Sequence, residues 1–261
     1  MKGNNLWKLT RFEIYKLIST RSFYICLGIL FALVGVTAFT SEMMIDQLGD
    51  MAELTDSYKN MSTLTCFMTA LTSGSISLML GIFVPIFACE DYNIGTIRNI
   101  LSRGYSRFEI YTSKFIAVLA ATFAMIIVCC FAGLVFGAVL FTSGDVSFGG
   151  QQFKTLLVQM IVVIAYACVF YAISVMLQKT GTSIAFCIAM PMVLVILLRL
   201  GDTALIDQNI SLSRYWLDGI ATSISSVTVE NSKLLSAFLC SIAYIAASLV
   251  GGWFGSVSNE Y

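Results

Sequence analysis

The chain has 261 residues, of which 58% are hydrophobic and 11% charged, and its formal net charge is zero. Soluble domains carry about 25% charged residues, so the composition favours a membrane protein, and the balanced charge does not indicate a nucleic-acid partner. The absence of histidine removes the commonest general base and the commonest metal ligand.

Residues 1–21 are the first predicted element and hold five basic residues and one acid. On a helical wheel, apolar side chains including Trp7 share one face and basic side chains including Lys16 share the other, whereas Phe12 and Glu13 interrupt the pattern. A basic amphipathic helix with tryptophan on its apolar side is typical of a helix that lies along the lipid headgroups. The alternative is a basic flank that only sets the orientation of the chain.

Six apolar runs follow, and we interpret each as a transmembrane helix because a hydrocarbon core of about 30 Å needs about 20 residues. The first run is too long for the apolar part of a signal peptide, so we expect it to stay uncleaved. Pro85 lies near the inner end of the second run, where it can loosen the last turn, and Pro191 lies inside the short fifth run. The six runs are Ser22–Thr40, Cys66–Ala88, Phe115–Phe141, Phe153–Leu177, Ser183–Leu198 and Lys233–Phe254.

The loops between these runs differ in charge. Residues 41–65 are acidic and 142–152 are glycine-rich, and both are expected outside, whereas 178–182 form a tight inner turn. The loop 201–232 contains a stretch, 210–224, that is too short and polar to span, so we expect it to be partly re-entrant. The inner segments hold ten Lys and Arg residues and the outer segments five, which predicts that both termini are cytoplasmic.

The longest polar segment with basic character, residues 89–114, separates the second and third runs. Isoleucine and leucine recur there at helical spacing, which predicts a short amphipathic helix from about Asp91 to Ser102. Gly104 stands where a helix commonly ends in a left-handed residue. Ser106 and Glu109 form a Ser-x-x-Glu capping box that begins the next helix. The segment is therefore predicted to form a helix, a tight turn and the beginning of a second helix.

This short helix carries Arg98, with Arg103 and Arg107 following it, and two interpretations remain open on these residues alone. The helix can rest on anionic headgroups as a topology anchor. It can instead insert into a groove of a soluble partner and transmit motion to the spans on either side.

The segment resembles the inner loop of the membrane subunits of type-2 ABC exporters, and the resemblance extends to six spans and two inner termini. The N-terminal segment is similar to the amphipathic entry helix of that family. The residues that carry the resemblance are Glu90, Gly95, Thr96, Ile97, Arg98, Leu101, Ser106, Arg107 and Lys114 in the loop, and Glu13, Lys16, Thr20, Arg21, Ser22 and Phe23 at the N-terminus.

The resemblance implies an all-α integral membrane protein with an N-terminal interfacial elbow helix and a cytoplasmic coupling helix, in one permease domain over residues 1–261. It implies two kinds of partner within the bilayer assembly: a second permease subunit, identical or different, and ATP-binding subunits that bind ATP and Mg. This chain itself would bind no cofactor. The residues implied in coupling to the ATPase subunit are Glu90, Asp91, Tyr92, Gly95, Thr96, Arg98, Leu101, Arg103, Ser106 and Arg107.

The sequence lacks the phosphate loop of an ATPase, so we expect no enzyme activity from this chain alone. No acid lies in the middle of a span, which disfavours an aspartyl protease and an ion-coupled transporter. The cysteines have no CxxC spacing and are expected as small buried side chains. These observations favour a permease subunit in the bacterial plasma membrane that exports a hydrophobic or amphipathic cargo such as an antimicrobial peptide. The alternative is a stand-alone immunity or sensor protein that binds a peptide without ATP-driven transport.

Overall fold

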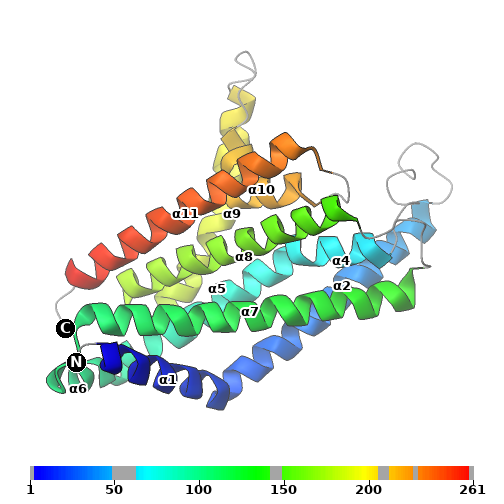
Figure 1. Cartoon of the computed structure of the whole chain (residues 1–261). Helices are drawn as coiled ribbons and strands as arrows, with labels where there is room; N and C mark the ends of the chain where they lie inside the picture. Colours follow the sequence, from blue (N-terminus) through cyan, green and yellow to red (C-terminus); the bar gives the residue numbers. More distant parts are fainter. Residues whose placement is uncertain (1–2, 49–62, 142–148, 205–211, 226–228, 259–261) are drawn as a thin grey trace.

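The computed structural model describes residues 3–48, 63–141, 149–204, 212–225 and 229–258, and every element in these ranges is helical (Figure 1). Six of its helical stretches are long and apolar enough to cross a membrane. This confirms an all-α protein with six helices that are able to span a membrane. The stretches are Arg21–Met44, Thr63–Ile94, Arg107–Leu140, Gly150–Leu177, Thr180–Thr203 and Asn231–Ser256.

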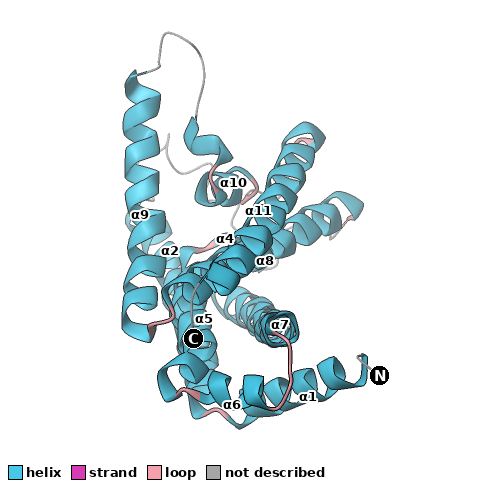
Figure 2. Ribbon diagram, turned by 90° about the vertical axis from the view of Figure 1, so that its left-hand side faces the viewer, coloured by secondary structure: helices cyan, strands magenta, loops and turns pink. Residues whose placement is uncertain are grey.

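The predicted N-terminal helix is present as α1 (Gly3–Ser19), and α2 (Arg21–Leu48) begins two residues after it ends. Figure 2 shows α1 lying across one end of the bundle. Its buried stripe contains Leu9, Glu13 and Leu17, while Trp7 is 68% exposed. Glu13, which interrupts the amphipathic pattern in the sequence, therefore lies on the face that packs against the bundle.

The second span consists of two helices, α4 (Thr63–Thr72) and α5 (Gly74–Ile94), separated at Ser73. Ser73 is extended, with φ −64° and ψ 143°. The interruption thus lies at the Thr-Ser-Gly sequence in the first half of the span. Pro85 lies within α5 and does not end it. A buried proline is tolerated there because neighbouring helices cover the backbone that its ring leaves unbonded.

The core of the bundle is formed by α4 and α5 together with α7 (Arg107–Leu140) and α8 (Gly150–Leu177). Helix association within a membrane depends on close packing of small residues rather than on hydrophobic burial. Gly137 of α7 shows this contact, because a Cβ added there would lie 3.1 Å from the carbonyl oxygen of Thr63 in α4. The helix α11 (Asn231–Ser258) packs along the other side of α8. Six of the eight cysteines are buried, and they lie on these core helices, on α2 and on α9.

The fifth span, α9 (Thr180–Ala204), is longer than predicted. The predicted run, 183–198, was too short because residues 180–182 and 199–204 also belong to the helix, which begins three residues after α8 ends. Only 6% of the most apolar window of α9 is buried, and Figure 2 shows this helix standing apart from the bundle.

Part of the predicted re-entrant loop is described, as a 3-10 turn, η2 (Leu212–Tyr215), and the short helix α10 (Leu217–Ser223). Seven residues are too few to cross a bilayer, and Trp216, Leu217 and Ile220 are buried. Much of the acidic loop 41–65, most of the turn 142–152 and the tail 259–261 lie outside the described residues. The first residues of α1 and the last residues of α11 lie at the end of the bundle where α6 (Thr96–Ser102) is found (Figure 1).

Candidate functional site

The corner between α5 and α7 is built by two left-handed glycines and a capping box. Gly95, with φ 74°, ends α5, and Gly104, with φ 85°, follows α6. Ser106 Oγ accepts the Glu109 amide at 3.2 Å, and Glu109 Oε2 accepts the Ser106 amide at 2.8 Å. The predicted left-handed Gly104 and the predicted capping box are confirmed. The predicted helix from Asp91 to Ser102 is corrected, because Gly95 divides it and its first four residues complete α5.

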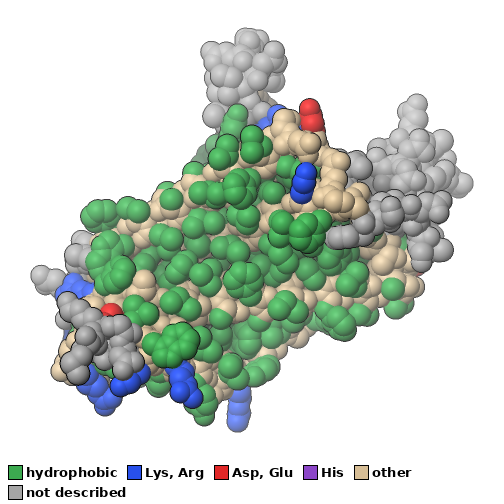
Figure 3. All heavy atoms as spheres, in the orientation of Figure 1, with side chains coloured by type: hydrophobic (Ala, Val, Ile, Leu, Met, Phe, Trp, Pro, Cys, Tyr) green, Lys and Arg blue, Asp and Glu red, His purple; other side chains and the backbone are tan. Residues whose placement is uncertain are grey.

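The helix α6 presents its charge outward from this corner. Ile97 is the buried residue of α6, at 3% exposure, whereas Arg98 is exposed, as are Arg103 and Arg107 beyond the helix. Figure 3 shows Lys and Arg side chains gathered at this end of the molecule, below a flank covered by hydrophobic side chains. The molecule therefore has a basic end beside an apolar flank.

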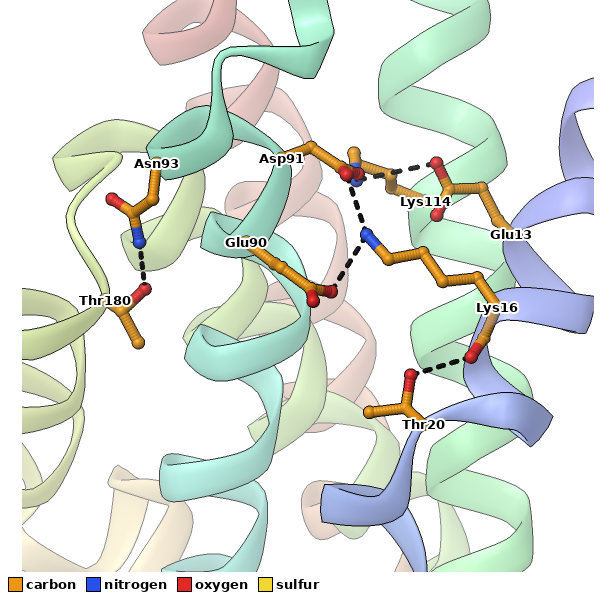
Figure 4. A network of polar contacts seen from close by, with 8 residues as sticks. All are labelled: Glu13, Lys16, Thr20, Glu90, Asp91, Asn93, Lys114 and Thr180. Atoms are coloured by element: carbon orange, nitrogen blue, oxygen red, sulfur yellow. Dashed lines mark hydrogen bonds and ion pairs between the residues drawn. The ribbon is translucent and has the colours of Figure 1, made fainter.

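A network of five charged side chains joins α1, α5 and α7 directly beside the corner (Figure 4). Lys16 of α1 donates to Asp91 Oδ1 at 2.7 Å and pairs with Glu90 Oε2 at 2.9 Å. Lys114 of α7 donates to Asp91 Oδ2, so both oxygens of this carboxylate are occupied. Lys114 Nζ also lies 3.5 Å from Glu13 Oε1.

The network is largely closed to solvent. The side chains of Lys114 and Asp91 are 1% and 7% exposed, whereas that of Glu90 is 38% exposed. The ring of Phe87 faces both lysines, with Nζ of Lys16 and of Lys114 at 5.8 and 5.9 Å from its centroid. Such cation–π contacts add to the stabilisation of a desolvated ammonium group. The network therefore couples α1 to two spanning helices through buried charge.

Glu13 is the weakest member of the network. It is fully buried, and neither carboxylate oxygen accepts a hydrogen bond within the described part of the chain. Burial raises the pKa of Glu13 above its ordinary value, since the attraction of Lys114 only partly compensates. For Lys16, burial alone would lower the pKa, but hydrogen bonds to Asp91 and Glu90 raise it above its usual range. Protonation of Glu13 would leave two carboxylates facing two lysines.

Further contacts at this end attach the remaining spans. Asn93, in the last turn of α5, donates to Thr180 Oγ1 at the start of α9 (Figure 4). Tyr111 of α7 donates to the Leu249 carbonyl of α11 at 3.1 Å. The last turns of α5 and the first turns of α7 thus contact α1, α9 and α11.

The structure brings two of the predicted coupling residues, Glu90 and Asp91, into the charge network. Asp91 lies inside the packing of the chain, and only Glu90 reaches the surface there. The other predicted residues lie on the corner, where Ile97 and the glycines set the shape and the arginines are exposed. Those residues are Tyr92, Gly95, Thr96, Arg98, Leu101, Arg103, Ser106 and Arg107.

Three members of the network were not predicted as site residues from the sequence: Glu13, Lys16 and Lys114. In the sequence they stand as parts of a helical pattern or as charges of the inner segments. One signal was available: Glu13 is four residues from both Leu9 and Leu17, so it shares their helix face. An acid on that face requires a buried cationic partner. Within the described ranges, no cluster of acidic and cysteine side chains is arranged to hold a metal ion.

The family model described as protein of unknown function (DUF2705) matches residues 56–255, which is more than half of the chain. The chain belongs to this family. The DUF2705 match includes the α5–α7 corner and Lys114, and it begins after α1 and its two members of the charge network. A search of curated proteins finds no match to the chain.

Proposed function

We propose that this protein is the membrane subunit of an ATP-driven exporter, in which α6 is the coupling helix and α1 the interfacial elbow helix. In this proposal both termini and the α5–α7 corner face the cytoplasm of a bacterial cell. The chain forms half of the translocation path, pairs with a second permease subunit, and depends on separate subunits that bind ATP and Mg. The cargo is a hydrophobic or amphipathic compound such as an antimicrobial peptide.

The observation that carries the proposal is the construction of the corner. An exposed basic helix is connected to two spanning helices through single left-handed glycines and a capping box, so its position is tied to theirs. A displacement of α6 by a docked subunit would therefore be passed to α5 and α7. A helix that served only as a headgroup anchor would not need a defined geometry at both ends.

The charge network supports the same proposal. It holds α1 against α5 and α7 through Lys16, Asp91 and Lys114, so the surface helix, the corner and two core spans form one connected unit. Such a connection allows the elbow helix to follow the spans when they move. A sensor that acts by binding at the outer surface gains nothing from this arrangement at the opposite end.

The test is purification of the native complex in mild detergent, followed by identification of the co-purifying proteins by mass spectrometry. We expect an ATP-binding subunit in near-equal amount. Arg98→Glu should release it, because reversing the charge on the exposed face of α6 opposes docking. Arg214→Glu is the matched control, since Arg214 is an exposed arginine on η2 away from the corner.

Two results would contradict the proposal. One is recovery of the protein without any ATP-binding subunit, also after cross-linking, which would favour the stand-alone immunity or sensor protein. The other is retention of the subunit by both arginine variants, which would remove α6 from the interface.

A further inference from the structure

A cavity of about 410 Å³ lies between α5, α8, α9 and α10, on the side where α9 stands off the bundle. This volume falls within the range of small-molecule sites. Its wall is mainly apolar and includes Leu78, Phe170, Met192 and Ile196. Since α9 contributes mainly exposed apolar side chains, the cavity is bordered by a surface that faces lipid.

One end of this cavity is polar. Tyr166 of α8 and Asp218 of α10 line it, and Asp218 is its only charged residue. Within the described residues, Asp218 has no ion pair or hydrogen bond, and the Tyr166 hydroxyl has no hydrogen-bond partner. A carboxylate beside an apolar cavity is costly unless a cation or hydrogen-bond donors compensate it.

A second acceptor lies deeper at the same end. A narrow space of about 10 Å³, room for about one water molecule, shares Gly74, Ser77, Tyr166 and Asp218 with the cavity and reaches Gln159. Gln159 is 1% exposed and donates through Nε2 to the Ile224 carbonyl at 2.9 Å. Its Oε1 is buried and has no partner among the described residues. The polar end therefore presents one buried acceptor without a partner among the described residues, Gln159 Oε1, beside the half-buried carboxylate of Asp218, and no basic side chain lines it.

The position of Asp218 is fixed by close packing behind it. A Cβ added to Gly219 would lie 2.0 Å from the Ser213 carbonyl oxygen, so only glycine permits this approach of α10 to η2. The buried Leu217 and Ile220 hold α10 in the core on either side of the acid. The carboxylate is thus held at the cavity end by the backbone and not by a partner.

We infer that this cavity binds an amphipathic cation, with an apolar body between α5, α8 and α9 and a protonated amine at Asp218. The amine supplies both missing elements, a positive charge for the carboxylate and N–H donors for the acceptors. A neutral or anionic amphiphile of the same size fills the apolar part but leaves Asp218 uncompensated. Binding at this site requires no ATPase. As the cargo site, it rests on the proposed function and narrows the cargo to cationic amphiphiles.

The test uses the full-length protein in nanodiscs of zwitterionic lipid, which do not concentrate cations themselves. The probes are a diazirine-bearing decylamine and the corresponding diazirine-bearing alcohol, with labelled residues located by mass spectrometry. We expect the amine to label Leu78 and Met192 about ten-fold more than the alcohol does, the size of one charge-assisted hydrogen bond. Asp218→Asn should reduce amine labelling to the level of the alcohol.

Two variants complete the design. Glu230→Gln is the matched control, because it removes an exposed acid at the start of α11 that does not line the cavity. It should leave labelling unchanged. Val195→Trp fills the cavity and should reduce labelling by both probes. Helix content and the elution profile establish that each variant is folded.

A measurement on the unchanged protein keeps the test decisive if Asp218→Asn does not fold. Excess decylamine should displace the amine probe, and excess decyl sulfate should not. The inference is overturned if the two competitors act equally. It is also overturned if folded Asp218→Asn is labelled like the unchanged protein, or if the label spreads evenly to lipid-facing residues such as Ile127 of α7.

Discussion

Replacing Lys114 by Met removes the cation at the centre of the charge network while keeping most of the side-chain volume. Removing one partner of a buried ion pair costs about 3–5 kcal/mol, because an uncompensated charge stays behind. Lys114 is 1% exposed, so solvent screening does not reduce this cost. Lys16 still pairs with Asp91, and Glu13 can take up a proton. We therefore expect Lys114→Met to lower the free energy of unfolding by about 3 kcal/mol, the lower end of that range.

The assay is the free energy of unfolding in mixed micelles, from an SDS titration followed by helical circular dichroism. The control is Lys179→Met, which removes an exposed lysine from the turn after α8 and should change the free energy by no more than about 0.5 kcal/mol. Adding Glu13→Gln to Lys114→Met should recover about 1 kcal/mol or more, because it removes the carboxylate that has no other cation beside it.

Two outcomes would refute this account of the network. The first is a loss below about 1 kcal/mol for Lys114→Met, a value typical of exposed pairs. The second is a double variant no more stable than Lys114→Met, since Glu13 would then not interact with Lys114. Either result would mean that packing alone holds α1 on the bundle.

Three further predictions concern α1 and the corner. The pKa of Glu13 is higher in the folded protein than its ordinary value of 4.5. The contribution of Glu13 to the free energy of unfolding is therefore fully present below pH 4.5 and is lost as pH rises through the folded pKa. A pH series of SDS titrations should therefore show Glu13→Gln gaining stability over the unchanged protein as pH rises, and a constant difference would contradict this. Gly95→Ala meets open space but forces φ 74° on alanine, which costs about 1–2 kcal/mol and should speed amide exchange in α6. Ser106→Ala loses the capping box with Glu109, costs about 0.5–2 kcal/mol, and should speed exchange in the first turn of α7, whereas Ser102→Ala should not.

The six spans could be predicted because each is an apolar run of sufficient length. The break at Ser73 could not, because hydropathy averaged over a span hides three small residues, Thr72, Ser73 and Gly74, between apolar neighbours. The same averaging shortened α9, whose first turn is polar but joins the helix once α8 ends at the left-handed Gln178. Local structure could be predicted where a specific hydrogen bond defines it, as in the capping box at Ser106.

The charge network could not be predicted from the sequence, because it depends on contacts between distant segments. Lys16 and Lys114 are 98 residues apart in number and read as two inner positive charges, and only the fold places both on Asp91. Glu13 was the informative residue, because an acid on a buried helix face needs a partner. The sequence pattern indicates that such a partner exists, but the partner's identity depends on which helices cross at that end.

One helix connects the two sites described here. From Leu78 at the cavity to Asp91 in the charge network, α5 rises about 20 Å at 1.5 Å per residue, with no interruption other than Pro85. It begins at the Ser73 break, close to Leu78, and ends at Gly95, just beyond Asp91, and it is helical between these points. Under the proposed function, a subunit that displaced α6 would move α5 as a unit, and the other end of α5 would shift the wall of the cavity.

Gly95→Ala should then alter amine labelling at Leu78 although it touches neither the amine nor Asp218, whereas Ser102→Ala should not. Equal labelling in both variants would separate the cavity from the corner.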